Sequence, residues 1–181
     1  MIKFCPRCGK KSFSRSKSHN QPENQVKDFK CSECNFQYFH NTAATVGAAI
    51  KYKDKILLTS RAYNPGKGML DLPGGFVDYN ESLEDALRRE IEEELGITNL
   101  GDMKYLFSFP NSYDYADITY RTLDSFFAIN LKEEPQMNLS DEISDVSWMN
   151  LDKINLEEVA FDSIKNAIVA IRNKQISPIS Q

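Results

Sequence analysis

Long hydrophobic runs are missing from this sequence of 181 residues. No stretch of about 18 consecutive apolar residues occurs, and the first residues, MIKFCPRCGKK, lack the hydrophobic segment of a signal peptide. Basic residues are also in deficit, because 22 Lys and Arg stand against 26 Asp and Glu, a net charge of −4. Such a chain offers no positive field for nucleic acid. We therefore expect a cytoplasmic protein without a membrane or DNA partner, and RNA is not an expected ligand either.

Cysteine is confined to one end of the chain. The four cysteines are Cys5 and Cys8 in CPRC, and Cys31 and Cys34 in CSEC. Two such C-x2-C pairs at this separation are typical of a tetrahedral zinc site. Two disulfides or four free thiols would fit the same spacing, but a reducing compartment disfavours disulfides. We predict a zinc ribbon over residues 1–40, in which structural Zn2+ supplies folding energy that the polar segment between the pairs cannot.

Beyond residue 41 the hydrophobic pattern alternates between the periods of strands and helices. The expected strands are 46–50, 56–58, 103–113, 118–131 and 144–151, and the expected helices are 82–95 and 155–174. Strands, a helix, more strands and a closing helix are typical of an α/β sandwich with a mixed sheet. We assign this second domain to residues 41–174 and regard residues 175–181 as a tail.

The helix expected at 82–95 has an unfavourable charge distribution. Glu90, Glu92, Glu93 and Glu94 crowd its C-terminal end, where the macrodipole disfavours each carboxylate by up to about 1 kcal/mol. At 100° per residue, roughly one 100° arc holds Glu90, Glu93 and Glu94, whereas Glu92 points away. A solvated acidic face would fit this pattern. A site for Mg2+ or Mn2+ would explain it, because these cations take carboxylate and phosphate oxygens as ligands.

The residues around these glutamates form a longer pattern. Across 23 residues the chain places Gly75, Glu81, Arg89-Glu90-Ile91, Glu93-Glu94 and Gly96-Ile97. This spacing resembles the Nudix hydrolase signature G-x5-E-x7-R-E-U-x-E-E-x-G-U, where U is a bulky aliphatic residue, and every specified position is met. The resemblance implies an α/β fold, namely a Nudix-type α/β/α sandwich with a mixed sheet. It also implies hydrolysis of a nucleoside diphosphate linked to another group, X, with release of a nucleoside monophosphate.

The resemblance implies a role for each residue of the signature. Glu90, Glu93 and Glu94 would be ligands of Mg2+ (or Mn2+) and catalytic groups, and the carbonyl of Gly75 would be a further metal ligand. These metals would lower the pKa of the attacking water and neutralise the diphosphate.

Other residues would support or extend this site. Arg89 and Glu81 would pair and hold the loop of the signature against its helix. A further catalytic carboxylate is expected outside the signature, at Glu142, with Asp141 and Asp145 as competing choices and a plain charged loop as the other interpretation.

Substrate-binding residues are expected outside the signature as well. Arg61 ends the second expected strand and could hold a phosphate, although a surface arginine would fit equally. Phe109 and Tyr113 belong to an aromatic-rich segment that could stack on an adenine or flavin ring, or pack between strands.

A four-cysteine ribbon before the Nudix signature resembles two subgroups. One is the NADH pyrophosphatases, which also act on NAD-capped RNA, and the other acts on ADP-ribose or FAD. The first subgroup carries S-Q-P-W-P-F-P-x-S, whereas YLFSFPNSYDY here lacks the Trp and the second Pro, which argues against NADH. The ribbon-bearing relatives also suggest a homodimer. Two other functions fit the sequence: a non-catalytic nucleotide sensor and an NAD-decapping RNA enzyme.

Overall fold

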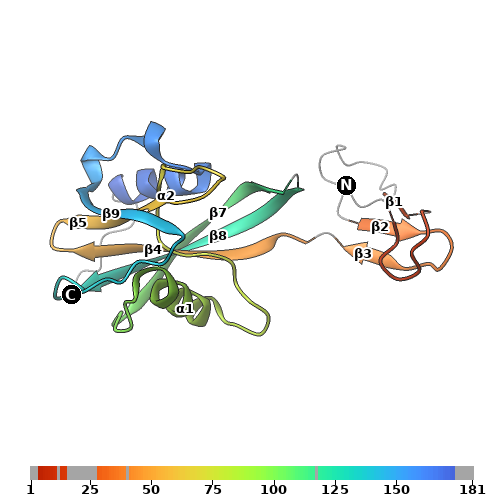
Figure 1. Ribbon diagram of the computed structural model, residues 1–181, viewed down its shortest axis with the longest axis horizontal. Coiled ribbons are helices and arrows are strands. Elements are labelled where there is room, and N and C mark those ends of the chain that lie inside the picture. The colour runs from red at the N-terminus through yellow and green to blue at the C-terminus, as the bar shows by residue number, and fades with distance from the viewer. Residues whose placement is uncertain (1–3, 12, 16–27, 40, 117, 174–181) are drawn as a thin grey trace. The chain divides into compact units, whose positions relative to one another are not determined.

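The chain forms two compact units, whose boundary in the sequence falls between Thr42 and Ala43. The computed structural model describes residues 4–11, 13–15, 28–39, 41–116 and 118–173 (Figure 1). The predicted tail, 175–181, lies outside the described residues.

The N-terminal unit is a small antiparallel sheet. Its strands are β1 (Phe13–Arg15), β2 (Asp28–Cys31) and β3 (Gln37–Phe39), in the order β1-β2-β3. Its core in the described part of the chain consists of Cys5, Phe29 and Cys31, with a few partly buried neighbours. A core of this size is too small to stabilise a domain alone, which is the usual situation of metal-stabilised modules.

The second unit is built on a mixed sheet of six strands. Strands β4 and β8 run parallel over their whole pairing, and the other pairs are antiparallel. The order of hydrogen-bonded neighbours is β6-β5-β4-β8-β7, and β9 also pairs with β5. The strands are β4 (Ala43–Tyr52), β5 (Lys55–Arg61), β6 (Leu70–Asp71), β7 (Met103–Tyr115), β8 (Ile118–Leu131) and β9 (Ile143–Asn150).

Helices cover both faces of this sheet. Figure 1 shows α1 (Leu83–Leu95) on one face and α2 (Asp162–Arg172) on the other. Neighbouring residues of one strand divide between the two cores, because side chains alternate along a strand: Phe127 packs with α1 and Phe126 with α2. These layers confirm the predicted α/β/α sandwich. No helix in the described ranges has the length and apolar character that crossing a membrane requires.

The limits of α1 agree with the prediction. The Ser82 hydroxyl accepts a hydrogen bond from the Asp85 amide at 3.1 Å, and Gly96 ends the helix in the left-handed conformation, with φ 71°. Ser82 and Gly96 are thus the N-cap and the C-cap, and serine and glycine are residue types that favour these positions. An apolar stripe with a residue at every fourth position faces the core: Leu87, Ile91 and Leu95 are buried, and Leu83 is partly buried.

The closing helix is shorter than predicted. Residues 155–174 were expected to be helical throughout, but the short 3-10 helices η2 (Leu151–Lys153) and η3 (Leu156–Glu158) precede α2. Val159 forms a bridge with Leu70, and the Ala160 amide donates to the Leu70 carbonyl at 2.9 Å. This pairing with β6 holds the segment extended, so the prediction was wrong for its first turns.

Strands β4 and β5 separate soon after their hairpin, and a loop fills the space. The two strands pair at only two positions. Further along β4, the Val46 amide donates to the Gly75 carbonyl and the Ala48 amide to the Pro73 carbonyl, each at 2.9 Å. The loop that precedes α1 therefore lies against the middle of the sheet. Gly74 permits this approach, since a Cβ there would lie 2.1 Å from the Val46 carbonyl oxygen.

We predict that Gly74→Ala lowers the free energy of unfolding by about 3 kcal/mol or more, because it combines backbone strain with a steric clash. Gly101→Ala is the matched control: Gly101 also has a positive φ, 61°, but a Cβ there would meet nothing within 4 Å. We expect a loss of about 1–2 kcal/mol from the conformation alone. Urea unfolding followed by fluorescence of Trp148, the single tryptophan, measures both. Equal losses would contradict the prediction.

Candidate active site

A pocket of about 340 Å³ lies where the loop 74–76, α1, β4 and β8 meet. Residues that are far apart in the sequence line it together. Of the site residues predicted from the sequence, the pocket gathers Arg61, Gly75, Glu90, Glu93, Glu94, Tyr113 and Glu142.

The glutamates of α1 differ in their surroundings. Glu94 is the most enclosed, and its carboxylate accepts a hydrogen bond from the Gly74 amide at 2.9 Å. Burial raises the pKa of Glu94 to about 8, and that amide bond opposes the shift. Burial also raises the pKa of Glu90, which the neighbouring Arg89 opposes. The side chain of Glu93 is 60% exposed.

The first glycine of the signature is required by Glu90. A Cβ on Gly75 would lie 2.6 Å from the carboxyl carbon of Glu90, so no larger residue fits there without displacing that carboxylate. The Gly75 carbonyl accepts the Val46 amide at 2.9 Å. A carbonyl oxygen has two lone pairs, so one remains available, which is compatible with the metal-ligand role that the resemblance implies.

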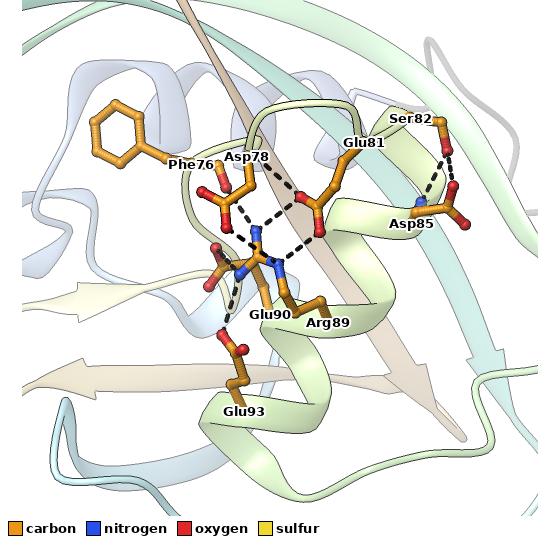
Figure 2. A network of polar contacts seen from close by, with 8 residues as sticks. All are labelled: Phe76, Asp78, Glu81, Ser82, Asp85, Arg89, Glu90 and Glu93. Carbon is orange, nitrogen blue, oxygen red and sulfur yellow. Dashed lines mark hydrogen bonds and ion pairs between the residues drawn. The ribbon is translucent and has the colours of Figure 1, made fainter.

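Arg89 connects the loop of the signature to α1, as Figure 2 shows. Its guanidinium donates to both carboxylate oxygens of Glu81, at 2.7 and 3.0 Å, and to the Phe76 carbonyl at 2.9 Å. These hydrogen bonds lower the pKa of Glu81. The structure thus brings together the Arg89–Glu81 pair that the sequence suggested, in the two-pronged geometry that arginine favours.

Arg89 also contacts two of the glutamates proposed as metal ligands, which the sequence did not indicate. Its Nη1 donates to Glu90 at 2.8 Å and to Glu93 at 3.0 Å (Figure 2). One guanidinium therefore offsets part of the repulsion among the carboxylates at this end of the helix. Glu92, whose side chain is exposed, is not among the pocket residues, in agreement with the helical wheel.

The C-terminal end of α1 is capped by the segment before β9. The Asn138 amide donates to the Leu95 carbonyl at 2.8 Å, and the Ser140 amide donates to the Glu94 carbonyl at 3.0 Å. Backbone amides thus satisfy the last carbonyls of the helix, where the dipole is negative. The same contacts bring the residues before β9 beside the glutamates.

Glu142 follows this capping segment and lines the pocket, whereas Asp141 and Asp145 are not among the lining residues. Its backbone carbonyl accepts the Ala62 amide at 2.9 Å, which ties it to the end of β5. Of the three carboxylates weighed from the sequence, the structure therefore brings Glu142 to the other site residues.

Arg61 is a pocket residue, and its side chain is only 22% exposed. It forms an ion pair with Asp71 at 2.8 Å, donates to the Pro65 carbonyl at 2.7 Å and lies over the Phe161 ring, 5.0 Å from its centroid. Burial raises the pKa of Asp71 to about 6, and Arg61 opposes that shift. These contacts disagree with the interpretation of Arg61 as a surface arginine.

The two aromatic residues predicted to bind substrate, Tyr113 and Phe109, lie in different surroundings. Tyr113 lines the pocket, with its ring 5.7 Å from that of Phe76 and 5.6 Å from that of Phe161. Phe109 is not among the lining residues. Its ring packs against Phe107 and Phe126 in the core under α2, at 5.1 and 6.4 Å. This placement supports the alternative that Phe109 packs between strands, because its side of β7 is covered by the core at that level.

Several pocket residues were not predicted, among them Asp71, Asp124 and Phe161. Asp124 carried a signal that could have been used, since it interrupts the apolar strand segment that ends in SFFAI, and a carboxylate in a buried strand usually has a specific partner. In the sequence, Phe161 is an apolar residue within the segment expected to form the closing helix, and nothing local marks it as part of a pocket.

The cysteines form a compact group in the N-terminal unit. All four sulfur atoms lie within 4.8 Å of one another, with Cys5 to Cys34 at 3.7 Å and Cys8 to Cys31 at 3.6 Å. Sulfurs about 2.3 Å from a tetrahedral zinc ion are separated by about 3.8 Å, so the arrangement fits Zn2+. None of the four is in a disulfide, so the disulfide alternative does not hold.

The two cysteine turns have the same backbone geometry. The Gly9 amide donates to the Cys5 carbonyl at 2.8 Å, and the Asn35 amide donates to the Cys31 carbonyl at 3.0 Å. Gly9 and Asn35 have φ values of 69° and 56°. Both residues are thus in the left-handed conformation, which glycine adopts freely and asparagine tolerates.

Comparison with known proteins now decides the family. Residues 41–167 match the family model described as the NUDIX domain. The chain belongs to the Nudix hydrolase family. It is 32% identical over 130 residues to an ADP-ribose pyrophosphatase from Methanocaldococcus jannaschii, which covers 72% of this chain and 73% of that protein.

Two further Nudix proteins are similar to this chain. The NAD-capped RNA hydrolase NudC of Haemophilus influenzae is 28% identical over 154 residues, 83% of this chain; the chain spans only 52% of the length of that relative. The NUDIX domain of Shewanella oneidensis NrtR, solved with ADP ribose, has a TM-score of 0.62 and 26% identity, covering 76% of this chain and 90% of that one.

We predict that the purified protein contains one Zn2+ per chain, and that Cys5→Ser removes it, because a tetrahedral thiolate site loses most of its affinity with one ligand. Elemental analysis measures the zinc. Unfolding of the Nudix unit, followed by Trp148 fluorescence, should keep its midpoint, since the four thiols lie in the other unit. Unchanged zinc content in Cys5→Ser would contradict the assignment.

Proposed function

We propose that this Nudix protein is a Mg2+- or Mn2+-dependent pyrophosphohydrolase. It cleaves the diphosphate of a nucleoside diphosphate linked to X, with ADP-ribose or a related dinucleotide as substrate, and releases a nucleoside monophosphate. The observation that carries this proposal is the charge of the pocket. Its lining contains one cation, Arg61, already paired with Asp71, and seven carboxylates, those of Asp71, Asp78, Glu90, Glu93, Glu94, Asp124 and Glu142.

Such a pocket would repel a diphosphate unless divalent cations bind first. Glu90, Glu93 and Glu94 supply the oxygen donors that Mg2+ and Mn2+ prefer, with Glu142 and the Gly75 carbonyl beside them. The raised pKa values of Glu90 and Glu94 fit this role, because a buried carboxyl that ionises poorly gains most from a nearby cation. When bound, the metal supplies an acidified water and neutralises the charge on the diphosphate.

The thiols converge on one point, and the carboxylates surround a pocket. Among the described residues, the four cysteines are the group of His, Cys, Asp or Glu side chains that could hold a metal ion together, with ligand atoms within 4.8 Å of one another. This difference fits the two ions. Structural zinc takes four protein ligands, whereas Mg2+ keeps several waters and shares substrate oxygens, so its protein ligands need not converge on one point.

Residues of this chain would perform the remaining tasks. Arg89 and Glu81 hold the loop and helix that position the glutamates. Arg61 is oriented by Asp71 to contact a phosphate oxygen, and Tyr113 offers a ring for stacking a base. Glu90 and Glu142 are the candidates to accept the proton of the attacking water.

The relatives support a substrate that contains adenosine diphosphate. One is named for ADP-ribose and another for NAD-capped RNA, and both of these compounds contain adenosine diphosphate joined to a second group. The altered segment around Phe109 and Pro110 argues against the NADH subgroup. A cytoplasmic location and a homodimer remain predictions.

A hydrolysis panel tests the reaction and separates the alternatives. The panel contains ADP-ribose, NADH, FAD, NAD-capped RNA and ATP with Mg2+, with the products identified by mass spectrometry. We expect AMP from ADP-ribose or a dinucleotide, and no product after chelation with EDTA. Cleavage of the capped RNA alone would support the decapping enzyme. Tight binding of one compound without turnover of any would contradict the proposal and support the nucleotide sensor.

We predict that Glu93→Gln lowers kcat for the best substrate of this panel by about 100-fold or more, because it removes a metal-binding charge while keeping the side-chain shape. Glu92→Gln is the matched control, an identical change one residue away on a side chain that does not line the pocket. It should retain wild-type kcat. Equal rates for the two variants would show that Glu93 is not part of the catalytic machinery.

A further inference from the structure

The pocket has a second buried polar group, which does not belong to the Nudix signature. It lies on the two long strands, with Asp124 and Thr122 on β8 and Asn111 on β7, and Asn111 is the cross-strand neighbour of Thr122. Asp124 is 9% exposed and Thr122 is 3% exposed. We call these three residues the polar wall.

Asp124 accepts three hydrogen bonds, all from neutral donors. The Thr45 hydroxyl donates to Oδ1 at 2.6 Å, and Asn111 Nδ2 and the Ser163 hydroxyl donate to Oδ2 at 3.0 and 2.5 Å. A carboxylate offers about four acceptor positions, so one, on Oδ1, has no partner among the residues that the structure describes. No cation in the described ranges forms an ion pair with Asp124, so its charge acts on whatever enters the pocket.

Thr122 adds a second group that is available to a ligand. Its side chain lines the pocket, and within the described residues no hydrogen bond joins its hydroxyl to the protein. This hydroxyl is not among the fully buried polar atoms that lack a partner in the described residues, so its oxygen still meets the solvent in the pocket. The polar wall thus presents one open acceptor and one unpaired hydroxyl to the same cavity as the glutamates.

The distance between the two halves of the pocket suggests what reaches the polar wall. Gly75 pairs with Val46 on β4, and Thr45 beside it is the neighbour of Asp124 on β8. Two strand spacings, together about 10 Å, therefore separate the Gly75 backbone from that of Asp124. If the diphosphate of a substrate lies at the glutamates, the group attached to that diphosphate would lie at the polar wall.

We propose that Asp124 and Thr122 bind hydroxyl groups of a neutral sugar attached to the diphosphate, and that the charge of Asp124 rejects a further phosphate at that position. This inference rests on the proposed function and deepens it. An open carboxylate acceptor requires a donor, which sugar hydroxyls supply and a phosphate does not. The pocket would therefore favour nucleoside diphosphate sugars over nucleoside triphosphates, through attraction of one and repulsion of the other.

Three substrates with the same ADP half test this assignment: ADP-ribose, the methyl ester of ADP and ATP. We expect the wild type to prefer ADP-ribose in kcat/KM. Asp124→Asn keeps the shape of the side chain but removes its charge and replaces one acceptor by a donor. We expect it to reduce the preference for ADP-ribose over each of the other two by about tenfold or more.

Ser163→Ala is the control for a merely structural role of Asp124. Ser163 is fully buried and donates to Oδ2, but it is not among the pocket residues. Its loss should change kcat/KM for all three substrates by the same factor. Thr122→Val, which removes only the pocket hydroxyl, should shift the preference in the same direction as Asp124→Asn, and it tests the proposal if Asp124→Asn fails to fold.

The outcomes separate this inference from the proposed function. If the wild type hydrolyses all three substrates equally, or if neither Asp124→Asn nor Thr122→Val changes the preference, the sugar assignment is wrong while the hydrolase stands. If the wild type hydrolyses none, the proposed reaction fails. In that case the dissociation constants of ADP-ribose and ADP methyl ester, measured by calorimetry with Mg2+, still decide whether Asp124 recognises the sugar.

Discussion

Repulsion among carboxylates is the constraint on which the second unit depends. Three glutamates sit at the C-terminal end of α1, where the helix dipole opposes them. Without a metal, the guanidinium of Arg89 offsets part of this charge by contacting Glu90 and Glu93 while it holds Glu81. Burial, with a smaller contribution from the neighbouring carboxylates, raises the pKa values of Glu90 and Glu94. A divalent cation bound as proposed would relieve the remaining repulsion.

The arrangement of the sheet leaves room for the glutamates of α1. Strands β4 and β5 separate, and the loop with Gly74 and Gly75 occupies the space between them. Each glycine has its own reason: at Gly74 a side chain would collide with the backbone of β4, and at Gly75 it would collide with the carboxylate of Glu90. Backbone approach and carboxylate position are therefore coupled, and both are needed to bring the glutamates to the pocket.

The two units arrange their candidate metal ligands in different ways. Four sulfurs converge closely in the N-terminal unit, whose hydrophobic core is very small. The carboxylates of the Nudix unit surround a pocket and leave room for water and substrate. A closed ligand set stabilises a fold, whereas an open one leaves coordination positions for chemistry. On the far side of that pocket, Asp124 and Thr122 offer groups that suit a neutral, hydroxyl-bearing ligand.

The sequence by itself determined the features that depend on neighbouring residues. The caps and buried stripe of α1, the paired cysteine turns and the spacing of the Nudix signature are local, because helix periodicity and turn geometry act over a few residues. Only the tertiary structure decided that the closing helix starts late, that Phe109 belongs to the core and that Asp124 and Phe161 reach the pocket. These outcomes depend on pairing between distant segments, such as Val159 with Leu70, and local spacing carries no information about which strands will meet.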